Sequence, residues 1–117
     1  MAKYDTLINP DAIQTVKLTV SVDVTAVAPW YQDGFHGFAM NDAASGEELV
    51  LDVSMRTWQV NIGSLTGVVG EIIYITPAGV LTNTASTNRP FGRVTVAKDS
   101  SNVVDLLVLP QVVTNAS

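Results

Sequence analysis

Apolar and polar residues alternate without interruption from Val16 to Val24, with an apolar residue at every even position. A period of two is typical of a strand that buries one face and exposes the other. Further runs of β-branched, aromatic or alternating residues also predict strands, at 35–40, 48–55, 57–62, 71–76, 79–83, 91–97 and 103–109. The hydrophobic pattern therefore predicts a chain built from short strands.

Turn-forming residues separate these runs, at 43–46, 63–70, 76–79, 83–90 and 98–102. No segment shows a sustained 3.6-residue period. Short helical turns are expected only at 9–13, where Asn9 suits a cap and Pro10 the first helical position, and within the loop 63–70. At 117 residues the chain fits one domain. We predict an all-β fold, a small β-barrel or jelly-roll-like sandwich over residues 14–110.

The two ends differ from this domain. Residues 1–13 alternate poorly but contain Tyr4, Leu7 and Ile8 among polar neighbours. Such a segment is either a frayed terminus or an N-terminal arm that becomes ordered against a partner, since apolar side chains are poor solvent-facing filler. Residues 111–117 follow Pro110, which ends strand pairing, and are predicted to form a C-terminal tail.

The composition indicates a surface short of charge. Charged residues make up 15% of the chain, against about 25% in ordinary soluble domains, and the mean hydropathy is +0.29. Two explanations stay open: part of the surface is buried against other subunits, or uncharged polar residues cover a monomer. The net charge is −5 and the six basic residues are scattered, whereas nucleic-acid binding needs clustered Lys and Arg. We therefore expect no nucleic-acid partner.

No apolar run is long enough to span a bilayer, and the first residues lack the layout of a secretion signal. We therefore expect that the protein does not associate with a membrane. We also expect that it is synthesised in the cytoplasm. The chain has no cysteine, so it offers neither disulfides nor thiolate ligands.

Candidate catalytic groups are few. His36 is the only histidine, and no serine lies in a G-x-S-x-G turn, so a Ser-His-Asp triad is not expected. Zinc would need three or four His, Cys or carboxylate ligands, which this chain does not provide in a recognisable pattern. His36 is predicted to be an ordinary strand or loop residue. We predict neither an enzyme nor a cofactor site.

Four acidic residues surround the small-residue turn 43–46, namely Asp42, Glu47, Glu48 and Asp52. Their spacing does not match a calcium-binding loop. We predict that 42–48 is a hairpin turn whose acids face solvent, with no metal site. The glycine-rich stretch 63–70 lacks the Gly-Lys of a phosphate-binding loop and is predicted to form tight turns.

Aromatic residues gather between Pro29 and Phe38. Trp30, Tyr31 and Phe35 lie in this segment, where large rings suit an interface anchor because they offer contact area at little rotamer cost. The alternative is a lid that closes one end of the barrel. Trp58 and Tyr74, inside alternating runs, are predicted to pack between strands.

Three stretches resemble, in this order, the capsid cement or head decoration proteins of tailed bacteriophages. They read GFHGFAMNDAASGEELVLDVSMRTWQVN, then GEIIYITPAGVLTNTA, then PFGRVTVAKDSSNVVDLLVLPQ. The matching positions fall at 37–39, 42–47, 70–79 and 92–109, and the resemblance covers about residues 34–109. The segment 28–33 is longer and more aromatic than the glycine turn found there in the family.

The resemblance implies a small β-barrel or jelly-roll-like domain that binds the outer face of an assembled capsid, as a trimer or less often a dimer. The partners would be the major capsid protein and further copies of this chain, and the protein would be located in the virion. We expect Tyr4, Leu7 and Ile8 to contact the capsid, and Trp30, Tyr31 and Phe35 to lie at an oligomer or capsid interface. The alternative function is a virion-attached module for a host surface or carbohydrate, with an exposed aromatic groove at Trp30 and Tyr31.

Overall fold

The computed structural model describes residues 14–111, which form β-strands and no helix. The strands are β1 (Thr15–Thr19), β2 (Pro29–Gln32), β3 (Phe35–Ala39), β4 (Glu48–Asp52), β5 (Thr57–Asn61), β6 (Ile72–Ile75), β7 (Leu81–Thr82), β8 (Arg89–Val96) and β9 (Val103–Val108). The all-β prediction is confirmed. Within residues 14–111 there is accordingly no helix that could cross a membrane.

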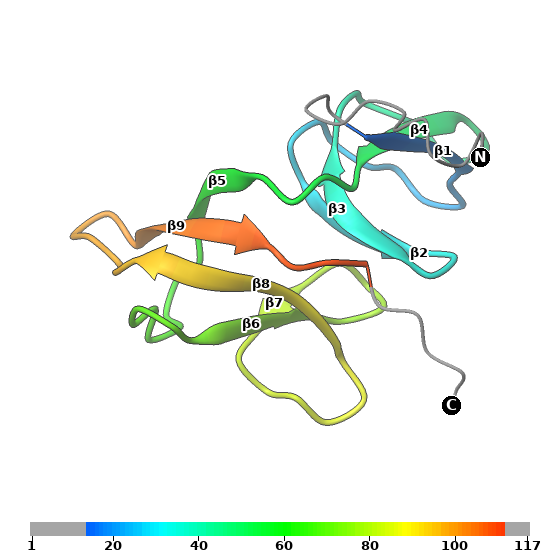
Figure 1. The fold of residues 1–117 in the computed structure, drawn as a ribbon. Coiled ribbons are helices and arrows are strands. Elements are labelled where there is room, and N and C mark those ends of the chain that lie inside the picture. The colour runs from blue at the N-terminus through cyan, green and yellow to red at the C-terminus, as the bar shows by residue number, and fades with distance from the viewer. Residues whose placement is uncertain (1–13, 112–117) are drawn as a thin grey trace, which may run out of the picture.

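The strands form two sheets that lie beside each other (Figure 1). One sheet has four strands in the order β1-β4-β3-β2, and the other has five in the order β5-β9-β8-β6-β7. Every pairing is antiparallel. The chain completes the four-stranded sheet first and then crosses once, between β4 and β5, to build the other.

The five-stranded sheet carries most of the hydrophobic core. Its strands alternate as the sequence pattern requires: in β9 the side chains of Val104, Leu106 and Val108 are buried and their neighbours are only half-buried. The buried residues of this face, joined by one residue of β3, form a cluster that we call the main core: Phe38, Val60, Ile62, Ile73, Ile75, Phe91, Val94, Val104, Leu106 and Val108. Burial of this apolar face is the principal stabilising term of the fold.

The four-stranded sheet is curled around a second cluster, the small core, made of Val20, Val24, Ala39, Ala43 and Leu49. The curl brings the two edge strands close to each other. Gln32 Nε2 of β2 donates a hydrogen bond to Thr19 O of β1 at 2.8 Å. Trp30 packs against the small core. The sheet is therefore curled into a half-barrel, with a side-chain hydrogen bond linking its two edge strands.

Phe38 of β3 joins the two sheets. Its ring stacks on Trp58 of β5 with centroids 4.6 Å apart, and meets Phe91 of β8 edge-on at 5.2 Å. The preceding residue, Gly37, touches the backbone of β4, where an added Cβ would overlap the carbonyl oxygen of Asp52. A glycine is required there because β3 approaches the end of β4 too closely for a Cβ, just before Phe38 enters the main core.

The first predicted strand is shorter than the alternation suggests. β1 ends at Thr19, and although Val20 and Val24 are buried, Val22 is 51% exposed. The turn after β3 bends this segment outward: Gly46 N donates to Val20 O at 2.7 Å, and Ser45 N to the carboxylate of Asp23 at 2.9 Å. The predicted strand is shorter because the backbone of residues 20–23 forms hydrogen bonds with the turn 43–46 instead of continuing the strand pairing.

The strand β2 was missed. Residues 29–32 pair with β3 through a two-residue turn in which Asp33 and Gly34 have φ of 52° and 85°, the geometry of a type I′ hairpin. The helical turn expected within 63–70 is wrong, since this loop contains only turns and bends. The helical turn expected at 9–13 lies outside the described residues.

Candidate functional site

The three aromatic residues expected at an interface all lie in the β2–β3 hairpin, and all three are half-buried. Trp30 packs on the small core, and its indole N–H donates to Gln32 Oε1 at 2.9 Å. Its ring also lies against the turn after β6, since a Cβ added at Gly79 would be 3.1 Å from two ring atoms. Much of the indole is thus packed inside the subunit, and the side chain as a whole is half-buried.

Tyr31 points to the main core and forms one side of a polar cluster between the sheets. The guanidinium carbon of Arg89, on β8, lies 5.1 Å from the centre of the Tyr31 ring, a cation–π arrangement. Arg89 is 6% exposed and donates from Nη2 to Gly34 O at 2.7 Å and from Nε to His36 Nδ1 at 3.0 Å. Arg89 thereby ties β8 to the β2–β3 hairpin.

His36 is fully buried and also holds the segment after β9. Its Nε2 donates to Leu109 O at 2.9 Å, while its backbone N–H and carbonyl oxygen exchange hydrogen bonds of 2.8 Å each with the side chain of Gln111. We call His36, Arg89, Leu109 and Gln111 the inter-sheet latch. It connects β3, β8 and the C-terminal segment, and Arg89 and Gln111 were not singled out in the sequence because no periodic pattern marks them.

Burial lowers the pKa of His36 from 6.5 to about 4, and the positive charge of Arg89 acts in the same direction. The hydrogen bond to Leu109 opposes this shift. The imidazole is therefore neutral near pH 7, with the proton on Nε2, and both ring nitrogens are engaged within the protein. A histidine bonded in this way acts as a structural connector, with no nitrogen directed at a substrate.

The acids around the turn 43–46 divide into two groups. Asp42, Glu47 and Glu48 are exposed, as predicted. The first two are not merely solvated, since Asp42 accepts from Ala26 N at 2.8 Å and Glu47 from Ala44 N at 2.7 Å. These carboxylates satisfy backbone N–H groups of the loops and so hold the turn in shape.

Asp52 contradicts the expectation that this cluster faces solvent, because it is fully buried. Its carboxylate accepts from Arg56 Nη1 at 2.9 Å and from Ser54 Oγ at 2.6 Å. The pairing with Arg56 and Ser54 permits burial of the charge at the end of β4, where the chain leaves one sheet for the other. Among residues 14–111, no group of three or more His, Asp or Glu is placed to hold a metal ion.

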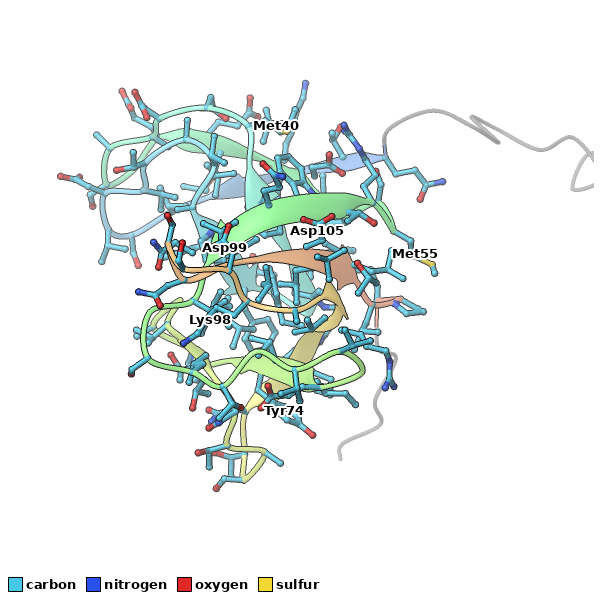
Figure 2. The ribbon with its side chains drawn as sticks, turned by 90° about the vertical axis from the view of Figure 1, so that its left-hand side faces the viewer. Met40, Met55, Tyr74, Lys98, Asp99 and Asp105 are labelled. Atoms are coloured by element: carbon cyan, nitrogen blue, oxygen red, sulfur yellow. The ribbon has the colours of Figure 1, made fainter. Side chains whose placement is uncertain are left out.

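The surface carries a second kind of candidate site, made of apolar side chains. The exposed large apolar residues are Val22, Val27, Met40, Met55, Val68, Val69, Val80 and Val96. Met40 and Met55, labelled in Figure 2, extend from the outside of the molecule. Val68 and Val69 could have been noticed in the sequence, since two adjacent valines are unusual inside a glycine-rich turn.

The predicted capsid-contacting residues Tyr4, Leu7 and Ile8 lie outside the described residues, as does nearly all of the tail 111–117. Comparison with known proteins adds no identification: no family model matches this chain, and no curated protein does.

Proposed function

We propose that this chain is a capsid decoration protein of a tailed bacteriophage, which binds the outer face of the assembled head and stabilises it against the pressure of packaged DNA. The resemblance of residues 34–109 to capsid cement proteins supports this proposal. The two-sheet all-β fold is compatible with the small β domain that the resemblance implies.

The observation that carries the proposal is the combination of a charge-poor chain with many exposed apolar side chains. Eight large apolar residues are exposed among residues 14–111, in a chain whose charged fraction is 15%. Several lie on turns that are held by hydrogen bonds, so their exposure is built into the fold. We propose that another protein covers part of this apolar surface, as is common where exposed apolar groups lie together.

A small domain gains from acting as an oligomer on a capsid. One copy offers too little surface to hold several shell subunits, whereas a symmetric oligomer presents the same contact several times and gains avidity. We propose a symmetric oligomer, with a trimer favoured over a dimer, bound to the major capsid protein. The work of the protein is to bury area across the seams between shell subunits, without bond-making chemistry.

The contacts are assigned by their chemistry. We propose that the N-terminal arm, through Tyr4, Leu7 and Ile8, pairs with or packs on strands of the capsid protein. Trp30, Tyr31 and Phe35 are proposed as anchors at an oligomer or capsid contact, each through the part of its ring that the hairpin leaves exposed.

Co-sedimentation with expanded empty capsids tests the function. The full chain is expected to sediment with capsids to a fixed stoichiometry, and a variant lacking residues 2–13 is expected to stay in solution while melting at the same temperature. Binding that survives the deletion would remove the arm from the mechanism. Retention on immobilised glycans without capsid binding would instead support a host-surface module.

A further inference from the structure

One side of β5 is an open strand edge. β5 is the last strand of the five-stranded sheet, and β9 is the one strand paired with it among residues 14–111. Ile62 N, just after β5, donates to Asn102 O, and Arg56 O, just before β5, accepts from Val108 N. Even-numbered positions of this segment therefore bond to β9, and the N–H and C=O groups of the odd-numbered ones point to the other side. The odd-numbered residues are all exposed, namely Thr57, Gln59 and Asn61.

The other edge strands of residues 14–111 have features that discourage the addition of a further strand. β1 has Lys17 at its centre, β2 begins with Pro29, and β7 has only two residues. β5 has no charged residue and no proline, and it pairs with β9 in one regular register. Asp105 of β9, labelled in Figure 2, lies opposite Gln59 and is one strand away from the open edge. An edge of this kind favours pairing with another strand.

The chain enters the described structure beside the start of this edge. Gln14 N donates to Ser54 Oγ at 2.7 Å, and Gln14 O accepts from Val53 N at 2.9 Å. Ser54 is three positions before Thr57, the first residue of β5, which limits the distance between them to about 11 Å. The N-terminal arm is thus tethered next to the open edge.

The arm is also long enough to cover the edge. Residues 1–13 precede Gln14 in the sequence, and a fully extended segment of this length spans up to about 45 Å. The length of β5 is only about 17 Å at the usual rise of a strand. A segment that leaves Gln14 and follows β5 from its first residue runs antiparallel to it, which is the pairing that a short connection allows. The tether makes this contact intramolecular and so raises the effective concentration of the arm at the edge.

The sequence of the arm favours one register. If residues 5–9 lie opposite β5, residues 10–13 remain as the connection, and Pro10, which has no N–H, stays outside the strand pairing. In this register Ile8 lies beside Trp58, whose indole is half-buried against the main core. The apolar side chain would then cover part of the ring that the sheet leaves exposed.

We propose that residues 5–9 dock as an added antiparallel strand on the open edge of β5 in the same molecule, when the protein is free in solution. The docked arm satisfies the backbone groups of the edge and prevents the edges of two copies from pairing. This inference goes beyond the proposed function. To pair with a strand of the capsid protein the arm has to leave β5, so the docked arm is a resting position that competes with capsid binding.

Disulfide trapping tests the docked position, because the natural chain has no cysteine. In the proposed register Leu7 lies opposite Gln59 at a Cα separation of about 5.5 Å, which a disulfide can bridge. The double variant Leu7→Cys/Gln59→Cys is expected to form an intramolecular disulfide at least about tenfold faster than Leu7→Cys/Arg93→Cys. Arg93 is the matched control, since it is exposed on the same face of the sheet but lies on β8, two strands further from the edge.

Two results of the trapping experiment would overturn the docking. One is an equal rate of disulfide formation at the two sites. The other is a product that remains a cross-linked dimer in dilute protein, because the arm would then occupy the edge of a second copy.

Amide hydrogen exchange gives a second measurement. Leu7→Pro removes an N–H that the docked arm donates to β5, and it is expected to speed exchange of the odd-numbered amides of β5 at least about tenfold. Thr6→Pro is the matched control, because the N–H of Thr6 points away from β5 in the proposed register. The even-numbered amides of β5 bond to β9 and should stay protected in both variants. Equal effects of the two prolines, or unprotected odd-numbered amides in the unaltered protein, would reject the docked strand.

Sedimentation with expanded capsids separates this inference from the proposed function. The oxidised Leu7→Cys/Gln59→Cys protein is expected to stay in solution and to bind capsids once reduction releases the arm. Full binding of the oxidised protein would reject the competition. Trapping in a protein that never binds capsids would leave the docking standing and reject the capsid function, whereas capsid binding by a protein that does not trap would do the reverse.

Discussion

The two sheets of this protein are stabilised in different ways. The five-stranded sheet buries an apolar face, and its main core is assembled from residues of β5, β6, β8 and β9, which alternate with less buried ones in β6 and β9. The four-stranded sheet has a small core of five residues and depends on individual contacts, such as the edge-to-edge bond from Gln32 to Thr19. The apolar pattern of its strands is enough to specify the five-stranded sheet. The four-stranded sheet depends on individual contacts between particular atoms.

The glycines provide the strongest test of this difference. Gly37→Ala in the four-stranded sheet would force a Cβ into the Asp52 carbonyl oxygen, which belongs to the backbone and cannot move by a rotamer change. We expect a loss of at least about 4 kcal/mol in the free energy of unfolding. Gly92→Ala in the five-stranded sheet would place a Cβ 2.6 Å from Leu106 Cγ, a side chain that can shift, and should cost about 1–3 kcal/mol.

Urea unfolding of both glycine variants measures the comparison. Equal losses at the two positions would show that the curled sheet is no more dependent on close backbone contact than the larger one.

The inter-sheet latch gives the next largest effect. Arg89→Met keeps the length of the side chain but leaves His36 Nδ1 and Gly34 O without their donor. With each unsatisfied buried group costing about 1–3 kcal/mol, we expect a loss of about 2–4 kcal/mol. Arg93→Met is the matched control on the same strand: Arg93 is exposed and donates only to Gly70 O, so its loss should stay below about 1 kcal/mol. Thermal melts of both variants would reject the latch if the two shifts were alike.

The same latch makes stability depend on pH. The His36 ring binds a proton near pH 6.5 in the unfolded chain and only near pH 4 in the folded protein. Between these values the unfolded state holds more protons, so the free energy of unfolding falls as the pH is lowered, by about 2 kcal/mol from pH 7.5 to pH 5. His36→Gln should flatten this dependence.

NMR measures this pKa directly, because a single histidine gives a single pair of ring signals. A titration midpoint close to 6.5 in the folded protein would contradict the buried, neutral ring. Because the His36→Gln variant keeps every carboxylate of the chain, the difference between the two proteins isolates the contribution of the imidazole.

The smallest expected change in the free energy of unfolding comes from substitutions in the β2–β3 turn. Asp33 has φ of 52° in the β2–β3 turn, a conformation that asparagine tolerates and alanine does not. Asp33→Ala should cost about 1 kcal/mol, and Asp33→Asn should change stability by less than about 0.5 kcal/mol. Chemical unfolding of the pair distinguishes backbone strain from loss of the carboxylate, since a loss of the carboxylate would affect both variants.

Much of the five-stranded sheet could be predicted from the sequence. The expected strands 57–62, 71–76 and 103–109 correspond to β5, β6 and β9 with boundaries shifted by one residue at an end or at each end. The shift is small because each strand has an apolar face to bury, and a slip of one residue would expose it. Trp58 is half-buried against the main core, as its place in an alternating run predicts.

The four-stranded sheet was harder to predict. Strand β2 contains Pro29 and aromatic residues in place of alternation, and only the Asp33-Gly34 pair signalled a hairpin there. Asp52 was expected to face solvent because carboxylates usually do, and only its neighbours in space, Arg56 and Ser54, make its burial possible. Neither partner can be recognised by periodicity.

By itself the sequence determined the strand content, the alternating faces of the main core and the scarcity of charge, because these depend on residue types and on spacing along the chain. Only the tertiary structure decided that β3 lies against the backbone of β4 at Gly37, and that His36 and Arg89, which are 53 positions apart in the sequence, meet between the sheets. Contacts of this second kind join residues far apart in the chain, and their energies depend on distances that no local pattern encodes.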